Sequence, residues 1–147
     1  MGERLKWGEA PQDQDEERWL ASNPLVRWLV HRMAKKASHV CGAGYSDHID
    51  VGTGSGLALK FVMGSWVRCR CIELLPEKGE RARQLLPNID LTIGNGAELP
   101  YETASAELVT CFETLEHLTD DVLERVVSEL RRVTSHRLVI TVPWEPW

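Results

Sequence analysis

Three glycines at alternate positions, Gly52, Gly54 and Gly56, mark a sharp turn in the chain. The short run before them, residues 48–51, alternates as a strand does, and an apolar helical pattern starts at residue 57. Glycine adopts positive φ without steric cost and lets other atoms approach where a Cβ would intrude. The segment therefore predicts a strand, a tight turn and a helix in succession.

Short strands and helices continue to alternate along the chain. We expect strands at 48–51, 66–72, 89–93, 107–112 and 137–142, and helices at 24–37, after the glycine turn, at 76–86 and at 120–133. Strands that alternate with helices of this length form a parallel sheet covered by helices. The expected fold is α/β, a Rossmann-like, helix-flanked, mostly parallel sheet of about five strands.

Two helix starts have recognisable signals. Ser22 or Asn23 is placed to cap the helix that begins at residue 24. Thr119 is placed to cap the helix at 120–133, whose two leading aspartates suit the positive end of its dipole.

Length and charge limit the classes of protein to consider. A chain of 147 residues has the length of a single domain. We expect a polar N-terminal arm at 1–21 and a core at 22–147. A net charge of -5 argues against a nucleic-acid partner held mainly by charge. With no run of about 18 apolar residues and no secretory signal, we expect a cytoplasmic protein.

Four cysteines lack the CxxC pairs and companion histidines of a zinc site, so we expect no metal and four buried thiols. They are Cys41, Cys69, Cys71 and Cys111.

A basic face on the first helix has two interpretations. It is either a solvated surface or a peripheral contact for acidic substrates or membrane headgroups, with Trp28 beside it favouring the second. Its residues are Arg27, His31, Arg32, Lys35 and Lys36.

An acidic residue at the end of the second strand adds meaning to the glycine turn. There Glu73 can accept hydrogen bonds from both ribose hydroxyls, as in dinucleotide and S-adenosylmethionine sites. A dinucleotide fingerprint that begins at Gly52 and Gly54 requires glycine or alanine at position 57, where Leu57 stands. No Lys-Ser or Lys-Thr pair closes the turn as in a P-loop.

In these segments the chain resembles the class I S-adenosylmethionine-dependent methyltransferases. Residues 50–56 look like their first motif, and Glu73 takes their ribose-binding position. Similar stretches follow, in the family's order, at 94–101, 107–118 and 133–147.

The resemblance implies S-adenosyl-L-methionine as the cofactor and methyl transfer to a small-molecule acceptor. Gly52 and Gly54 would line the methionine part, while Asn95 and Gly96 would face the adenine, although the family more often has Asp at the position of Asn95. A turn that binds nothing remains an alternative for Asn95 and Gly96. The full set of cofactor-binding candidates is Asp50, Gly52, Thr53, Gly54, Gly56, Glu73, Leu74, Asn95, Gly96, Ala97 and Phe112.

A general base is needed only where the acceptor must lose a proton, and His117 is the candidate. The alternative role for His117 is to stabilise its turn together with Glu116. Two other functions stay open, namely a module that binds the cofactor without turnover and an NAD-dependent oxidoreductase, which Leu57 disfavours.

The chain ends at Trp147, directly after the expected fifth strand, where members of the family continue through a sixth and a seventh strand. We therefore expect a core that is incomplete at its C-terminus and an open sheet edge that could pair with a second copy in a homo-oligomer.

Overall fold

The computed structural model describes residues 24–63 and 68–142, which contain one five-stranded parallel sheet. Its strands are β1 (Asp47–Val51), β2 (Arg68–Glu73), β3 (Asp90–Ile93), β4 (Ala106–Phe112) and β5 (Thr134–Thr141). They lie in the order β3-β2-β1-β4-β5, so the order reverses beside β1. Ligands of open α/β sheets bind at such a reversal, beyond the carboxyl ends of the strands.

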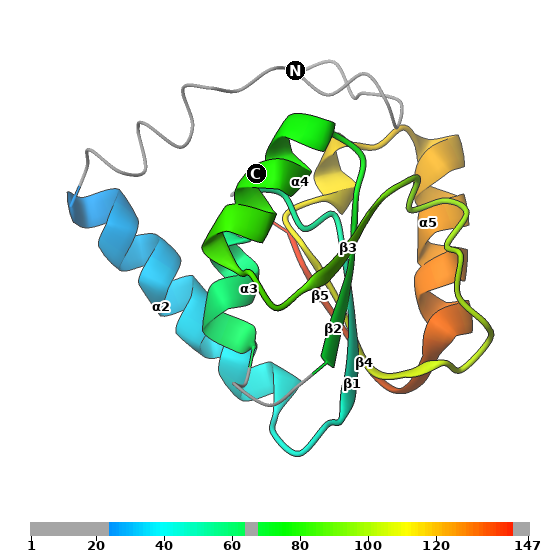
Figure 1. The fold of residues 1–147 in the computed structure, drawn as a ribbon, viewed down its shortest axis with the longest axis horizontal. Helices are drawn as coiled ribbons and strands as arrows, with labels where there is room; N and C mark the ends of the chain where they lie inside the picture. Colours follow the sequence, from blue (N-terminus) through cyan, green and yellow to red (C-terminus); the bar gives the residue numbers. More distant parts are fainter. Residues whose placement is uncertain (1–23, 64–67, 143–147) are drawn as a thin grey trace.

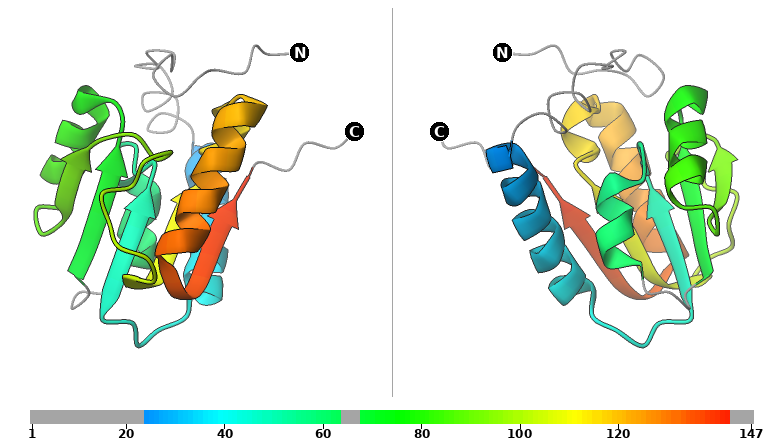
Figure 2. Two further views of the ribbon diagram at one scale, coloured as in Figure 1. Left: turned by 90° about the vertical axis from the view of Figure 1, so that its right-hand side faces the viewer. Right: turned by 60° about the vertical axis from the view of Figure 1, so that its left-hand side comes forward.

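Helices cover both faces of this sheet. One face carries α2 (Pro24–Cys41), α3 (Leu57–Val62) and α4 (Pro76–Leu85), and α5 (Asp120–Val133) lies on the other, as Figures 1 and 2 show. A short 3-10 helix, η1 (Leu115–His117), follows β4. The arrangement confirms the predicted α/β, Rossmann-like fold with parallel strands.

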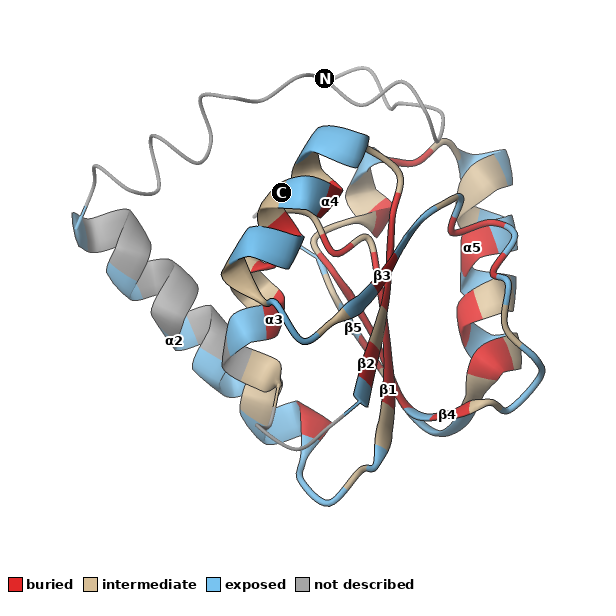
Figure 3. Ribbon diagram, viewed as in Figure 1, coloured by how far each residue is buried: buried red, intermediate tan, exposed pale blue. Residues whose placement is uncertain are grey.

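The apolar core lies mainly between the sheet and α5. Alternate residues of β1 and β4, such as Ile49 and Val109, point to this side, where Val126, Leu130 and Val133 of α5 are fully buried. Smaller clusters fill the opposite face under α2, α3 and α4. Figure 3 shows the buried central strands. The residues of the glycine turn therefore rest on a rigid base.

Most element boundaries fall within two residues of the sequence expectation, with two exceptions. The helix α2 continues to Cys41, past its expected end at residue 37. β5 begins at Thr134, directly after α5, and not at residue 137. Three segments lie outside the described residues, namely 1–23, 64–67 and 143–147. They include the predicted N-terminal arm, the predicted cap of α2 at Ser22 or Asn23, and the expected start of the second strand at residue 66.

The predicted cap of α5 is half right. Thr119 occupies the N-cap position, but its side chain makes no capping hydrogen bond, and its Oγ1 is buried without a hydrogen-bond partner. The first turn of α5 contains Asp120 and Asp121, whose negative charges interact favourably with the positive end of the helix dipole. The helix start is thus set by position and charge and not by the Thr119 hydroxyl.

Candidate functional site

The glycine turn leaves β1 and lies against the end of β2. The amides of Gly52 and Thr53 both donate to the carbonyl oxygen of Ile72, at 2.9 and 3.2 Å. All three glycines of the turn have positive φ, which a side chain would strain. The turn is thus held by backbone bonds in a conformation that favours glycine.

Only one of these glycines faces open space. A Cβ on Gly52 would overlap the side chain of Thr114, and one on Gly56 would press on Ala82 and Leu86 of the neighbouring segment. At Gly54 nothing lies within 4 Å of the Cβ position. The space at the Cβ position is thus open at Gly54 and filled by Thr114 at Gly52, and the expectation that both line the methionine part stays a prediction.

Glu73 lies directly beside this opening. Its Oε2 accepts a hydrogen bond from the Gly54 amide at 2.7 Å, and its Oε1 accepts one from the Leu75 amide at 2.9 Å. The residue is buried, with 6% exposed. A carboxylate has about four acceptor positions, so two remain for donors of a ligand. The two amides thus fix this carboxylate at the rim of the turn, next to Leu74.

The segment after β3 forms a compact turn. Asn95 Oδ1 accepts the Ala97 amide at 2.9 Å, and the Asn95 carbonyl oxygen accepts the Glu98 amide at 3.0 Å. Gly96 and Ala97 are buried, while Asn95 is exposed. The segment thus forms a turn in which the amide oxygen of Asn95 keeps a second lone pair for a ligand. Both interpretations of Asn95 and Gly96 stay predictions.

Two side chains of α5 hold this segment against the core. Glu129 Oε2 accepts the Leu99 amide at 2.7 Å, and Arg132 donates to the carbonyl oxygens of Tyr101 and Leu99 at 2.7 and 3.1 Å. Arg132 also pairs with Glu129 at 2.6 Å, and this contact holds the pKa of Glu129 below its usual range. Sequence reasoning missed this support.

The end of β4 meets the glycine turn from the other side. Phe112 is the last residue of the strand and is 9% exposed, and the following Glu113 has a left-handed φ of 46°. Thr114 then donates to the Phe112 carbonyl oxygen at 2.9 Å while its side chain covers Gly52. Sequence reasoning missed Thr114, since only the fold brings it to the turn.

His117 lies on η1, close in sequence to this strand end. Its imidazole is 65% exposed, and its Nε2 lies 3.8 Å from Glu116 Oε1. Both predicted roles of His117 stay predictions, because the exposed ring can contact a ligand or interact only with Glu116 in the turn.

Asp50, a predicted site residue, is buried at the end of β1 directly before the turn, with 2% exposure. Thr110 donates a short hydrogen bond to it, and Thr53 donates to its backbone carbonyl oxygen at 3.4 Å. Burial is the largest influence and raises its pKa from 3.8 to about 6. Neighbouring His48 is also buried, which lowers its pKa from 6.5 to about 4.

A polar residue inside an apolar strand was the available signal for this cluster. Thr110 interrupts the apolar strand Leu-Val-Thr-Cys-Phe, and His48 alternates with the apolar residues of β1. The four cysteines are free and buried, as expected.

The described ranges contain neither a membrane-spanning helix nor a candidate metal site. In residues 24–63 and 68–142, no helix is long and apolar enough to span a bilayer, and no group of three His, Cys, Asp or Glu side chains is arranged to hold a metal ion.

A family model described as "Methyltransferase domain" matches residues 49–137 of the chain. A protein of Mycolicibacterium smegmatis named as a probable S-adenosylmethionine-dependent methyltransferase is 28% identical over 120 residues. That match covers 81% of this chain, and the chain spans 42% of the length of that relative.

Solved structures share the fold. The N-methyltransferase NodS of Bradyrhizobium japonicum, in complex with S-adenosyl-L-homocysteine, aligns with a TM-score of 0.71 at 18% identity, over 87% of this chain and 67% of its own. An S-adenosylmethionine-dependent methyltransferase of Aquifex aeolicus aligns with a TM-score of 0.66 at 20% identity, over 85% of this chain and 70% of its own. At such identities the likeness shows the fold alone.

The family model covers more than half of the chain, from the first strand to the fifth, and includes the glycine turn, Glu73 and the segment after β3. The chain therefore belongs to the methyltransferase-domain family, the class I S-adenosylmethionine-dependent methyltransferases.

Proposed function

We propose that this chain binds S-adenosylmethionine at the glycine turn and transfers its methyl group to a small-molecule acceptor. The observation that carries the proposal is the Glu73 carboxylate, fixed by the Gly54 and Leu75 amides beside the open space above Gly54. A ribose with two adjacent hydroxyl groups suits the two free acceptor positions of this carboxylate.

The other candidate residues have distinct roles in this proposal. Gly54 admits the methionine part, Leu74 and Phe112 provide apolar contacts, and the segment at Asn95 receives the adenine. Gly96 and Ala97 complete the wall at the adenine, while Gly52, Thr53 and Gly56 keep the turn in shape.

When bound, the cofactor supplies a methyl group on a positively charged sulfur that is already a good leaving group. The protein then has to hold the acceptor atom in line at about 3 Å, which accounts for much of the acceleration in such reactions. His117 takes the proton in acceptors that must lose one. The segment after β4, Glu113 to His117, adjoins the glycine turn through Thr114, and we propose that the acceptor approaches from this side.

The test compares Glu73→Ala with wild type by calorimetry against S-adenosylhomocysteine. We expect at least a tenfold loss of affinity, because a charge-assisted hydrogen bond contributes about 1.5–3 kcal/mol. Glu77→Ala, an exposed carboxylate in the first turn of α4, is the matched control and should bind as wild type does. Equal affinity in all three proteins would reject the proposed site.

A module that binds the cofactor without turnover is the second candidate, favoured by the exposure of the only proposed base, His117. Binding of S-adenosylmethionine with no methyl transfer to any offered acceptor would support this second function. Competition by NAD and not by S-adenosylhomocysteine would instead revive the oxidoreductase alternative.

We also propose that the protein is cytoplasmic, since its described cysteines are free thiols.

Exposed cationic side chains on α2, a helix without acidic residues, support a peripheral contact with anionic headgroups. In this helix the Arg32 guanidinium lies 5.2 Å from the centre of the Trp28 ring. A vesicle co-sedimentation assay tests this contact. We expect the protein to sediment with vesicles of anionic lipid and not with vesicles of neutral lipid.

A further inference from the structure

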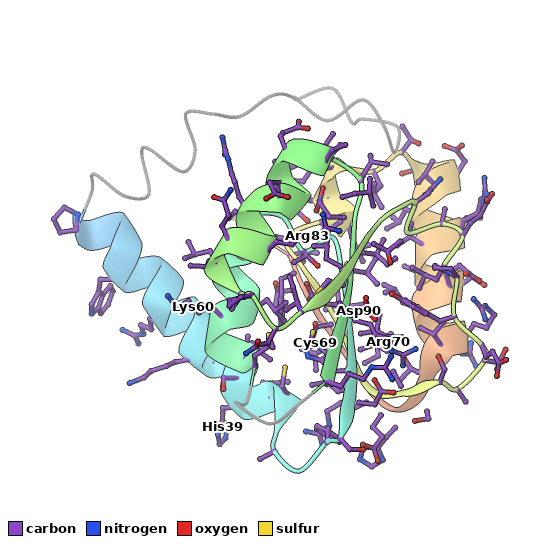
Figure 4. The ribbon with its side chains drawn as sticks, in the orientation of Figure 1. His39, Lys60, Cys69, Arg70, Arg83 and Asp90 are labelled. Atoms are coloured by element: carbon purple, nitrogen blue, oxygen red, sulfur yellow. The ribbon has the colours of Figure 1, made fainter. Side chains whose placement is uncertain are left out.

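A continuous chain of polar side chains crosses the sheet under the glycine turn. Thr110 of β4 bonds to Asp50 and, at 2.7 Å, to Nε2 of His48, whose Nδ1 lies 3.5 Å from Cys69 Sγ on β2. Cys71 Sγ extends the chain, 3.6 Å from Cys69 Sγ. All five residues are buried (Figure 4 labels Cys69). The chain therefore connects three neighbouring strands out of contact with water.

The direction of these hydrogen bonds follows from the ionisation of Asp50. A carboxylate only accepts, so the single hydroxyl proton of Thr110 points to Asp50, and Thr110 must then accept from His48 Nε2. His48 is neutral above pH about 4, because burial lowers its pKa. Its Nδ1 is then an acceptor for the Cys69 thiol. Every donor in the chain thus points towards Asp50.

Protonation of Asp50 reverses the whole chain. The carboxylic acid then donates to Thr110, Thr110 donates to His48 Nε2, and the proton of the neutral imidazole moves to Nδ1, facing Cys69. The tautomer of His48 therefore reports the charge of Asp50, although both side chains are buried.

Among residues 24–63 and 68–142, no cation contributes to the pKa of Asp50. The Thr110 and Thr53 hydrogen bonds lower it, while burial and the Glu73 carboxylate raise it. Its charge also acts on thiols of three elements, namely Cys41 of α2, Cys69 of β2 and Cys111 of β4. Within the described residues, this buried carboxylate therefore has no cationic partner, and a positively charged ligand at the turn would supply one.

We infer that Thr110 and His48 are positioning residues of the cofactor turn, whose directed hydrogen bonds hold Asp50 as a carboxylate that attracts the positively charged groups of bound S-adenosylmethionine. The inference rests on the proposed function, because it needs a cationic ligand at the turn. Thr110 and His48 act only through Asp50, and neither is expected to touch the ligand.

The first experiment uses the free protein and ¹⁵N-labelled histidine, with His48→Gln to identify the signals of His48. At pH 7.5 we expect the Nε2–H tautomer, and as the pH falls through about 6 we expect conversion to the Nδ1–H tautomer. Cys69→Ala should keep the Nε2–H tautomer at pH 7.5, because the bond to Thr110 remains. An Nδ1–H tautomer in wild type at pH 7.5 would overturn the inference.

The second experiment measures S-adenosylmethionine affinity by calorimetry from pH 5.5 to 8.5. In Thr110→Val the pH at which affinity falls should rise by about one to two units, because the carboxylate loses a hydrogen bond worth a ten- to hundredfold preference. At pH 6.5 this makes binding about tenfold weaker than in wild type. Thr110→Ser should restore the wild-type profile, since it returns the hydroxyl group.

Thr92→Val, an exposed threonine of β3, is the matched control and should bind as wild type does at every pH. An unchanged pH midpoint in Thr110→Val would overturn the inference. If wild type binds no S-adenosylmethionine at any pH, the proposed function fails, and the tautomer in the free protein still decides whether the hydrogen-bond chain is directed as described. That first measurement also stands if Thr110→Val does not fold.

Discussion

Gly52 and Gly54 share a positive φ but differ in their surroundings, which separates folding from binding at the level of single residues. Gly52 touches Thr114, whereas Gly54 faces open space beside Glu73. The sequence motif alone could not distinguish them, because the partner of Gly52 lies 62 residues away.

Alanine should therefore act mainly on stability at Gly52 and mainly on binding at Gly54. Gly52→Ala should lose about 2–4 kcal/mol of unfolding free energy through strain and overlap with Thr114. Gly54→Ala should lose only about 1–2 kcal/mol, from its backbone conformation, and weaken S-adenosylhomocysteine binding. Urea unfolding and calorimetry measure both, with Gly44→Ala, another open glycine at positive φ, as the control that leaves binding unchanged.

Asp50 should lower the stability of the fold at neutral pH. A pKa raised from 3.8 to about 6 means that stability present below pH 3.8 is lost as the pH rises through 6, by about 2–3 kcal/mol. Asp50→Asn should therefore unfold at higher urea than wild type at pH 7.5, and this gain should shrink towards pH 4. A variant less stable than wild type at pH 7.5 would contradict the burial argument.

His48 has the opposite linkage, since its pKa is lowered from 6.5 to about 4. Its contribution is present above pH 6.5 and is lost as the pH falls towards 4. The slopes of His48 and Asp50 therefore partly cancel in wild type between pH 4 and 6, and Asp50→Asn should reveal the acid sensitivity caused by His48.

Among the elements, α5 contributes a buried face and an anchor for the adenine segment. Leu130 is fully buried, whereas Val127 at the margin of the buried face is 37% exposed. Leu130→Ala should lower the unfolding free energy by about 2–4 kcal/mol, and Val127→Ala by less than about 1 kcal/mol. Comparable losses in both variants, measured by urea unfolding, would mean that this face assignment is wrong.

Arg132 should couple α5 to ligand binding. Arg132→Ala removes the bonds to the Leu99 and Tyr101 carbonyl oxygens, and we expect a loss of about 1–2 kcal/mol in stability and weaker S-adenosylhomocysteine binding through the loosened turn at Asn95. Arg125→Ala breaks only the exposed pair with Glu98 and serves as the control, with little change in either measurement.

Strand and helix positions were predictable where the apolar pattern was strong. The helix at 120–133 is bounded as expected, because its apolar residues recur at helical spacing. The start of β5 was missed because its first three residues, Thr134, Ser135 and His136, are polar and lie on the outermost strand, where no apolar alternation is required. The side chains that support the glycine turn could not be predicted for a different reason, since Thr110 and Thr114 are brought to it only by the order of strands in the sheet.

At the scale of the whole molecule, the described sheet has two open edges, at β3 and β5. Ile140 of β5 and the following Val142 are exposed apolar residues at one of them. We expect self-association that increases with concentration and is reduced by Ile140→Lys, because a charge on an edge strand opposes pairing with another chain. Sedimentation that shows only monomer at high concentration would contradict this expectation.

The parallel order of the strands also has a consequence for the timing of synthesis. The complete glycine motif emerges from the ribosome with β1, yet Thr110 and Thr114, which support Asp50 and fill the space beside Gly52, are about 60 residues later. A nascent chain that stops before residue 106 thus carries every glycine of the motif and none of its support from β4. We expect such a nascent chain to be unable to capture the cofactor, so that binding competence appears abruptly, late in translation, and not in proportion to the length made.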